Sequence, residues 1–161
     1  MSILVACIGN IFQGDDAFGC EVANVLAHRP ASADVRVVDF GIRGLDLTYA
    51  LLDAPDLTIL VDAVSRGGAP GTLYTIEPNL DDGQTSDQHL MDAHAMDPVK
   101  VLRAAKALGS HLRRVLLVGC EPADLGGENG RMGLTPPVSA AVDEAAAMVE
   151  SLIGKELRLQ Q

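Results

Sequence analysis

The chain alternates between two patterns of hydrophobic residues. Runs of strand length, rich in branched aliphatic side chains, occur at 3–8, 35–38, 57–61 and 115–118. Such runs, without regular polar positions, are typical of strands that are covered on both faces in a parallel sheet. We expect them to form the centre of a sheet, with residues 73–77 as a further short strand at its edge.

Between these runs, apolar residues recur at helical spacing. One stripe begins at Phe18, a second lies between Val101 and Leu108, and the longest is expected over about 137–153, after Pro136-Pro137. Asp97 is expected to cap the second of these helices, which Pro98 opens. Strands that alternate with helices predict a single domain over 1–161, a three-layer α/β/α sandwich around a mainly parallel twisted sheet. In such sheets ligands bind at the carboxyl ends of the strands.

Composition and charge narrow the classes of partner. The 161 residues carry a formal net charge of -10 and only 3% aromatic residues. Phosphates would be repelled, so we expect neither nucleic acid nor a membrane as partner, and a protein or a metal cation is the more natural ligand. The first eight residues lack the features of a signal peptide, and no apolar run is long enough for a bilayer, so we expect a cytoplasmic protein.

The three cysteines form neither an even disulfide set nor a CxxC pair. Cys7, Cys20 and Cys120 are therefore expected to be buried small hydrophobic residues in a reducing compartment.

The stretch IGNIFQGDDAFG, residues 8–19, places glycines between a strand and a helix, as a nucleotide-binding loop does. Asp15 and Asp16 would occupy the free amides and neutralise the positive helix end, so phosphate binding is a poor interpretation. An N-cap at the start of the following helix would account for only one of these two aspartates. We expect Asp15 to be that cap, whereas Asp16 could be either a cap or a ligand.

A second candidate carboxylate, Asp62, follows the apolar run LTILV. An aspartate here is often only a turn initiator, yet the predicted sheet places Asp16 and Asp62 at the same edge. Two carboxylates and one imidazole suit a divalent transition metal such as nickel, zinc or iron(II). No CxxC or HExxH motif indicates a structural zinc site.

Four histidines compete for the imidazole position. His28 ends the first predicted helix and His111 lies beside a basic pair, so both are expected to be structural or solvated. Of the other two, His94 is preferred to His89, because it lies just ahead of a helix start and is better anchored.

From residue 3 to about 153 the chain resembles the nickel-iron hydrogenase maturation endopeptidases. The resemblance rests on Asp15-Asp16, Asp62 and His94, together with the stretches DFGIRGLDL, LVDAVSRGGAPGTL, VGCEPADLG and MGLTPPV. The resemblance implies an α/β sandwich with metal-binding residues at Asp16, Asp62 and His94. It also implies cleavage of a C-terminal extension from the hydrogenase large-subunit precursor after nickel insertion, with the nickel as recognition signal. Cys7 and Ala17 stand where glycines are common in relatives.

Several alternatives stay open beside this resemblance. The precursor would supply the nickel, and another divalent metal such as zinc could occupy the isolated protein. Asp16 and Asp62 could instead share a proton as an aspartic-protease pair. The same ligands could also serve a non-catalytic nickel-binding chaperone that checks the precursor. Asp39 and Arg43 could line a substrate groove, although a simple turn explains them equally well.

Overall fold

The computed structural model describes residues 1–80 and 96–161. Within them, five strands form a single sheet in the order β2-β1-β3-β5-β4. The strands are β1 (Ile3–Ile8), β2 (Val35–Gly41), β3 (Leu57–Ala63), β4 (Leu73–Ile76) and β5 (Arg114–Cys120). Strand β4 runs antiparallel to β5 at the edge, and every other pair is parallel. The predicted edge strand and the mainly parallel sheet are confirmed.

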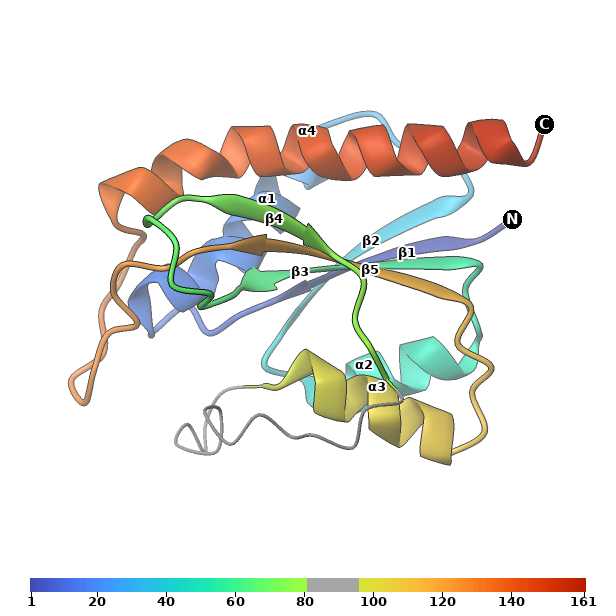
Figure 1. Ribbon diagram of the computed structural model, residues 1–161, viewed down its shortest axis with the longest axis horizontal. Helices are drawn as coiled ribbons and strands as arrows, with labels where there is room; N and C mark the ends of the chain where they lie inside the picture. Colours follow the sequence, from blue (N-terminus) through green and yellow to red (C-terminus); the bar gives the residue numbers. More distant parts are fainter. Residues whose placement is uncertain (81–95) are drawn as a thin grey trace.

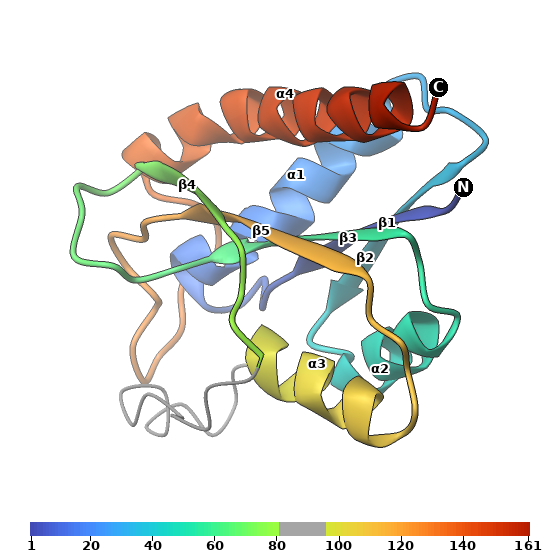
Figure 2. The same ribbon diagram turned by 45° about the vertical axis from the view of Figure 1, so that its right-hand side comes forward.

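Helices cover both faces of this sheet. They are α1 (Phe18–Ala27), which follows the short 3-10 turn η1 (Gly14–Ala17), α2 (Gly44–Leu52), α3 (Pro98–Ala107) and α4 (Pro136–Leu159). Helices α1 and α4 lie on one face, and α2 and α3 lie on the other (Figures 1 and 2). The predicted three-layer α/β/α sandwich is therefore present. No helix in 1–80 or 96–161 is long and apolar enough to cross a bilayer.

The central strands are buried on both faces, as their unbroken apolar runs predict. All six residues of β1 are buried. Val5 and Cys7 belong to the hydrophobic cluster that contains residues of α1 and α4. Leu4 and Ala6, which alternate with Val5 and Cys7 along the strand, belong to the cluster on the α2 and α3 side. Because successive side chains of a strand point to opposite faces, β1 contributes residues to two separate hydrophobic cores.

Helix α2 was not predicted from the sequence. It begins after Arg43 without a side-chain cap. Leu47 and Leu51 are fully buried, but Leu45 and Tyr49 are exposed at 65% and 58%. Because apolar residues lie on both the buried and the exposed face of α2, the sequence lacks the one-sided apolar pattern that predicts a helix.

Other element boundaries also differ from the predictions. Strand β3 extends to Ala63, so Asp62 lies inside the strand and not directly after it. Helix α4 continues to Leu159, where the nearly buried Glu156 is paired with Arg114 at 2.7 Å. The predicted start of α3 is confirmed, because the Asp97 carboxylate accepts a hydrogen bond from Val99 N.

Candidate active site

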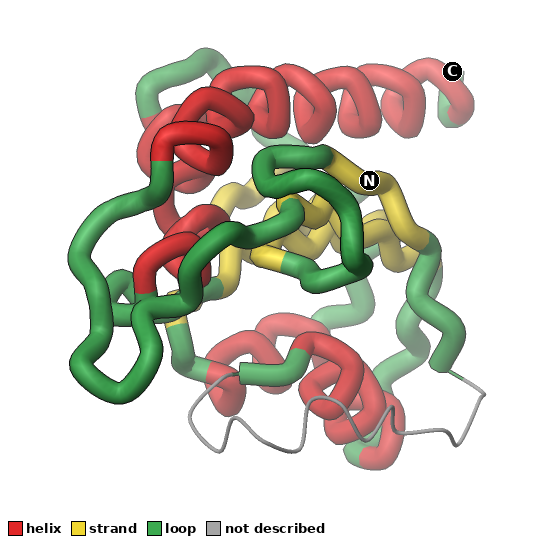
Figure 3. The backbone as a smooth tube through the Cα atoms, turned by 60° about the vertical axis from the view of Figure 1, so that its left-hand side comes forward, coloured by secondary structure: helices red, strands yellow, loops and turns green. Residues whose placement is uncertain are grey.

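The sheet order creates a topological switch point at one edge, and we use the word crevice for the region around the carboxyl ends of β1 and β3 at this point. The chain leaves β1 to form β2 on one side and then returns to form β3 on the other side of β1. Ligand sites in open α/β sheets lie at such a switch point, outside the carboxyl ends of the strands. Figure 3 turns this edge toward the viewer and shows it surrounded by loops. Asp16, which follows β1, and Asp62, at the end of β3, both lie here.

Two glycines of the 8–19 stretch are explained by close packing. A Cβ atom at Gly19 would overlap the carbonyl oxygen of Ile8 and come within 2.5 Å of that of Val61. A Cβ atom at Gly9 would overlap the backbone oxygen of Asp16. The glycines therefore let the start of α1 rest directly on the ends of β1 and β3, which fixes the backbone that carries Asp16.

Asp15 does not cap a helix, and the prediction that it does is wrong. Neither η1 nor α1 has a side-chain cap. The Asp15 carboxylate is fully buried and accepts hydrogen bonds from Ala123 N at 2.8 Å, Asp124 N at 2.9 Å and Thr135 N at 2.7 Å, and from the Thr135 hydroxyl. Burial alone would raise its pKa, but these bonds outweigh burial and lower the pKa. Asp15 fastens the connection between β5 and α4 to the turn after β1.

The neighbouring Asp16 and Asp62 have a different environment. The half-buried Asp16 accepts a hydrogen bond from Asn10 N at 2.9 Å, and Asp62, only 6% exposed, accepts one from Ala63 N at 2.8 Å. Burial raises the pKa of Asp62 well above its usual value, and the negative charges of Asp16 and then Asp97 raise it further. A buried carboxylate whose ionisation is opposed by a neighbouring negative charge is stabilised by a proton or a cation.

The predicted imidazole ligand cannot be placed beside them. His94 and the competing His89 lie outside the described residues. Within the part of the chain that is described, no three His, Cys, Asp or Glu side chains form a group able to hold a metal. Asp16 and Asp62 would supply two oxygen ligands, and a third ligand would have to come from elsewhere.

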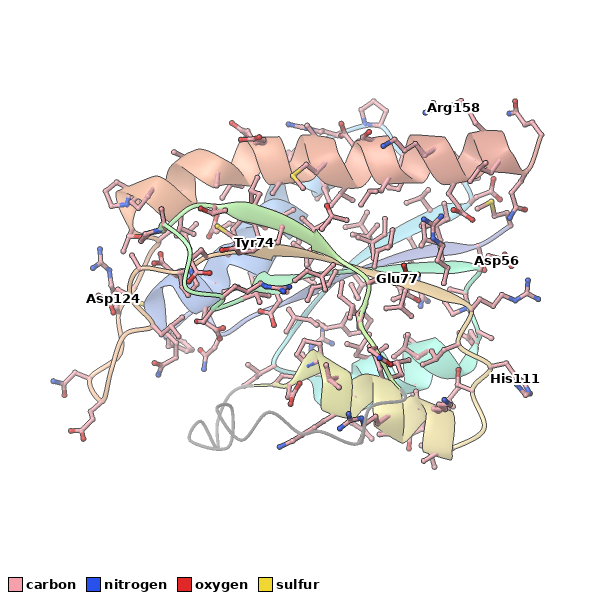
Figure 4. All side chains as sticks on the ribbon, viewed as in Figure 1. Asp56, Tyr74, Glu77, His111, Asp124 and Arg158 are labelled. Carbon is pink, nitrogen blue, oxygen red and sulfur yellow. The ribbon has the colours of Figure 1, made fainter. Side chains whose placement is uncertain are left out.

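The other two histidines lie as expected. His28 Nδ1 is 2.7 Å from Asn24 O at the end of α1. His111 is exposed at the edge of the molecule opposite to that of Asp124, as Figure 4 shows. Neither contributes to the crevice.

Asp39 and Arg43 form a turn at the end of β2. The Asp39 carboxylate accepts a hydrogen bond from Gly41 N, and the Arg43 guanidinium donates one to Asp39 O and pairs with Asp46 at 3.0 Å. These contacts favour the turn interpretation of both residues.

All three cysteines are free and buried, as predicted. Burial first, and then the neighbouring Asp39 carboxylate, raises the pKa of Cys20 to about 12. Burial likewise raises the pKa of Cys120 to about 11. The two thiols are therefore protonated at neutral pH and are poor nucleophiles.

Glu121 is a buried carboxylate whose role the sequence analysis missed. It lies at the end of β5, 5% exposed, and accepts hydrogen bonds from Arg66 N, Gly67 N and Tyr74 Oη at 2.7 to 3.0 Å. Although burial opposes ionisation, these bonds lower the pKa of Glu121. Its position directly after the apolar run of β5 in the sequence was the available signal. Glu121 holds the connection between β3 and β4 beside the crevice.

Comparison with known proteins identifies the family. The family model described as hydrogenase maturation protease matches residues 20–152. The chain belongs to the hydrogenase maturation protease family. A putative hydrogenase maturation protease of Methanocaldococcus jannaschii is 30% identical over 154 residues, which are 95% of each chain. The hydrogenase expression/formation protein HupM of Azotobacter chroococcum is 32% identical over 155 residues, 96% of this chain and 72% of HupM.

Solved structures agree with the sequence comparisons. The hydrogenase maturating endopeptidase HybD from Escherichia coli matches this chain with a TM-score of 0.76 and 28% identity, over 97% of this chain and 94% of HybD. A second Escherichia coli endopeptidase structure matches with a TM-score of 0.82 and 28% identity, over the same shares. The α/β fold and the family resemblance inferred from the sequence are both confirmed, and membership in this family supports protease activity.

Proposed function

We propose that this hydrogenase maturation protease removes the C-terminal extension of a nickel-iron hydrogenase large-subunit precursor after nickel insertion, and that the nickel is its recognition signal. The relatives are named for hydrogenase maturation and for hydrogenase expression or formation, which supports such a precursor as the partner. The reaction is expected in the cytoplasm, and this location stays a prediction.

The proposed ligands for the precursor's nickel are Asp16, Asp62 and His94. The two carboxylates are supported by the burial of Asp62 and by its pKa, which burial and then the charge of Asp16 raise. His94 is included on the family resemblance alone. A divalent cation between the two carboxylates would relieve both the desolvation and the repulsion. Zinc would satisfy the same donors in the isolated protein.

The chemistry of such a site follows from its donors. When bound, the metal would polarise the scissile carbonyl or activate a water molecule. The protein residues then have defined tasks. The Asn10 amide orients the Asp16 carboxylate, the Ala63 amide orients that of Asp62, and the surrounding strand ends exclude water from Asp62.

One other cleavage mechanism is supported by the same observation. Two coupled carboxylates, one with a raised pKa, also suit an aspartic-protease pair that shares a proton. A non-catalytic chaperone would use the same ligands but would leave the precursor intact. Metal dependence separates the two mechanisms, and cleavage itself separates both from the chaperone.

The test is the mass of the precursor after incubation with the protein, using precursor prepared with and without nickel. The variants Asp16→Asn and His94→Ala remove one proposed ligand each. His111→Ala is a matched control, because His111 is exposed and remote from the crevice.

Loss of a C-terminal peptide only with nickel, abolished by both ligand substitutions and retained in His111→Ala, would support the proposal. Nickel-dependent binding with unchanged mass would make the protein a chaperone. Cleavage that is independent of nickel and survives a chelator would favour the aspartic pair and overturn nickel recognition.

A further inference from the structure

Four large apolar side chains project from the loops beside the crevice. Ile11 and Phe12, in the turn after β1, are 46% and 61% exposed. Leu125 and Met132, in the connection between β5 and α4, are 39% and 69% exposed. We call these four residues the apolar patch. In Figures 1 and 3 the connection between β5 and α4 extends away from the sheet.

The two loops that form the apolar patch are joined to each other. Arg131 N donates a hydrogen bond to Phe12 O at 2.9 Å, and Gly14 N donates one to Arg131 O at 2.8 Å. A Cβ atom at Gly130 would approach Phe12 O to 2.7 Å, so the backbones are in close contact. Asp15, which follows the first loop in sequence, accepts hydrogen bonds from Asp124 N and Thr135 N of the second. A surface held in this way needs little ordering when it binds, which lowers the entropic cost of association.

The apolar patch is continuous with the candidate active site. Phe12 N donates a hydrogen bond to Asn10 Oδ1, and Asn10 N donates one to the Asp16 carboxylate. The backbone that carries Phe12 is thus held two hydrogen bonds away from the Asp16 carboxylate.

Charge assigns different parts of the partner to the patch and to the crevice. The crevice is acidic, with Asp62 buried close to the charges of Asp16 and Asp97, and therefore suits the cation of the partner. At the patch, Asp124 and Arg131 form an ion pair at 3.1 Å and cancel each other's charge. Between Leu125 and Met132 the other charged residue is the exposed Glu128, so the loop has a single uncompensated formal charge. The patch thus complements an apolar surface of low charge.

We propose that the apolar patch docks the folded body of the large-subunit precursor, while the acidic crevice receives its metal-bearing cleavage region. This assignment rests on the proposed function. Projecting side chains fit into depressions of a folded surface, whereas an extended tail needs a groove. Truncating anchors of this kind typically weakens a complex by about tenfold or more.

The experiment measures cleavage of full-length nickel-loaded precursor by the double variant Phe12→Ala/Met132→Ala, together with binding of the mature large subunit, which lacks the tail. The double variant Leu108→Ala/Leu159→Ala is the matched control, since it truncates two equally exposed side chains outside the patch (63% and 76%). Phe12→Leu/Met132→Leu tests rescue by apolar replacements. Thermal unfolding verifies that every variant is folded; if the alanine variant is not, Met132→Glu alone takes its place.

Docking of the body predicts that KM for the precursor rises about tenfold in the patch variant with little change in kcat. The mature subunit should bind the wild type and lose affinity for the variant by a similar factor, with the control variant within twofold and the leucine variant close to wild type. An unchanged KM, or equal binding of the mature subunit to both forms, would overturn the docking proposal. A wild-type protein that binds the precursor but never shortens it would contradict the proposed function instead.

Discussion

Strand β3 has an aspartate near each end, and the two have opposite environments. Asp56, just before the strand, accepts hydrogen bonds from Ser2 N at 2.9 Å and from Arg113 at 2.8 Å. The Ser2 amide first, and then the charge of Arg113, lower its pKa. Asp62, at the other end, is buried beside Asp16, and its pKa is raised. Figure 4 shows Asp56 at the edge of the sheet where β3 begins, far from the loop that contains Asp124.

The contrast separates carboxylates that stabilise the fold from those that are available for chemistry. A carboxylate whose charge is compensated within the fold does not need a ligand. Asp56 is compensated by Arg113, and Asp15 and Glu121 are compensated by backbone amides. Asp62 is held in a position that disfavours its charge, which is a typical property of catalytic and metal-binding groups. Such groups reduce stability and are kept for function.

The largest expected effect follows from removing the charge of Asp62. In Asp62→Asn the shape is kept and a buried negative charge is lost, so the free energy of unfolding should stay equal or rise by about 1 kcal/mol. Cleavage of nickel-loaded precursor should fall about a hundredfold or more, because a reacting-site charge is missing. Urea unfolding and the rate of peptide release measure the two quantities.

The matched control for Asp62→Asn is Asp56→Asn, at the other end of the same strand. It removes an ion pair at the protein surface and should leave cleavage within about twofold of wild type. A loss of cleavage as large as that of Asp62→Asn would contradict the distinction between the two ends of β3.

A large loss of stability is expected from Asp15→Ala. The substitution leaves the Ala123, Asp124 and Thr135 amides without their buried acceptor. Because each unpaired buried group is costly, the free energy of unfolding should fall by about 3 kcal/mol. Thr135→Val, which removes only the hydroxyl donor, should cost about 1 kcal/mol. Urea unfolding measures both, and equal losses would show that the backbone amides contribute nothing.

The smallest effect concerns Glu121, and it depends on pH. The pKa of Glu121 is lowered in the folded protein, so its contribution to stability is complete above its unfolded value of 4.5 and is lost as pH falls through the lower folded pKa. Glu121→Gln should therefore melt below wild type at pH 7. The gap in Tm should shrink as the pH is lowered beyond about 4.5. If the difference in Tm between wild type and Glu121→Gln grew at acid pH, the proposal that ionised Glu121 stabilises the fold would be contradicted.

The sequence predicted those parts of the fold that depend on local burial. The strands β1, β3 and β5 were predicted from short apolar runs, and the cap at Asp97 from the residues next to it. In each case a few neighbouring residues were enough. Helix α2 was missed, since its apolar residues lie on both its buried and exposed sides. Strand ends were misjudged because their last residues, such as Asp62, are polar although the strand continues.

The candidate site was predictable only to the extent that topology determines it. The convergence of Asp16 and Asp62 follows from the parallel order of β1 and β3. The role of Asp15 does not, because its partners lie 108 to 120 residues away and nothing in IGNIFQGDDAFG points to them. The assignment of His94 came from the family resemblance and stays a prediction.

The bridge between Asp15 and Thr135 also has a consequence for synthesis on the ribosome. The two residues are separated by 120 positions, which take about ten seconds to translate. Until Thr135 has emerged, the Asp15 carboxylate lacks its native partners and remains hydrated, and the turn that carries Asp16 is not locked. A nascent chain therefore cannot fix the turn that carries Asp16 until nearly its whole length is made.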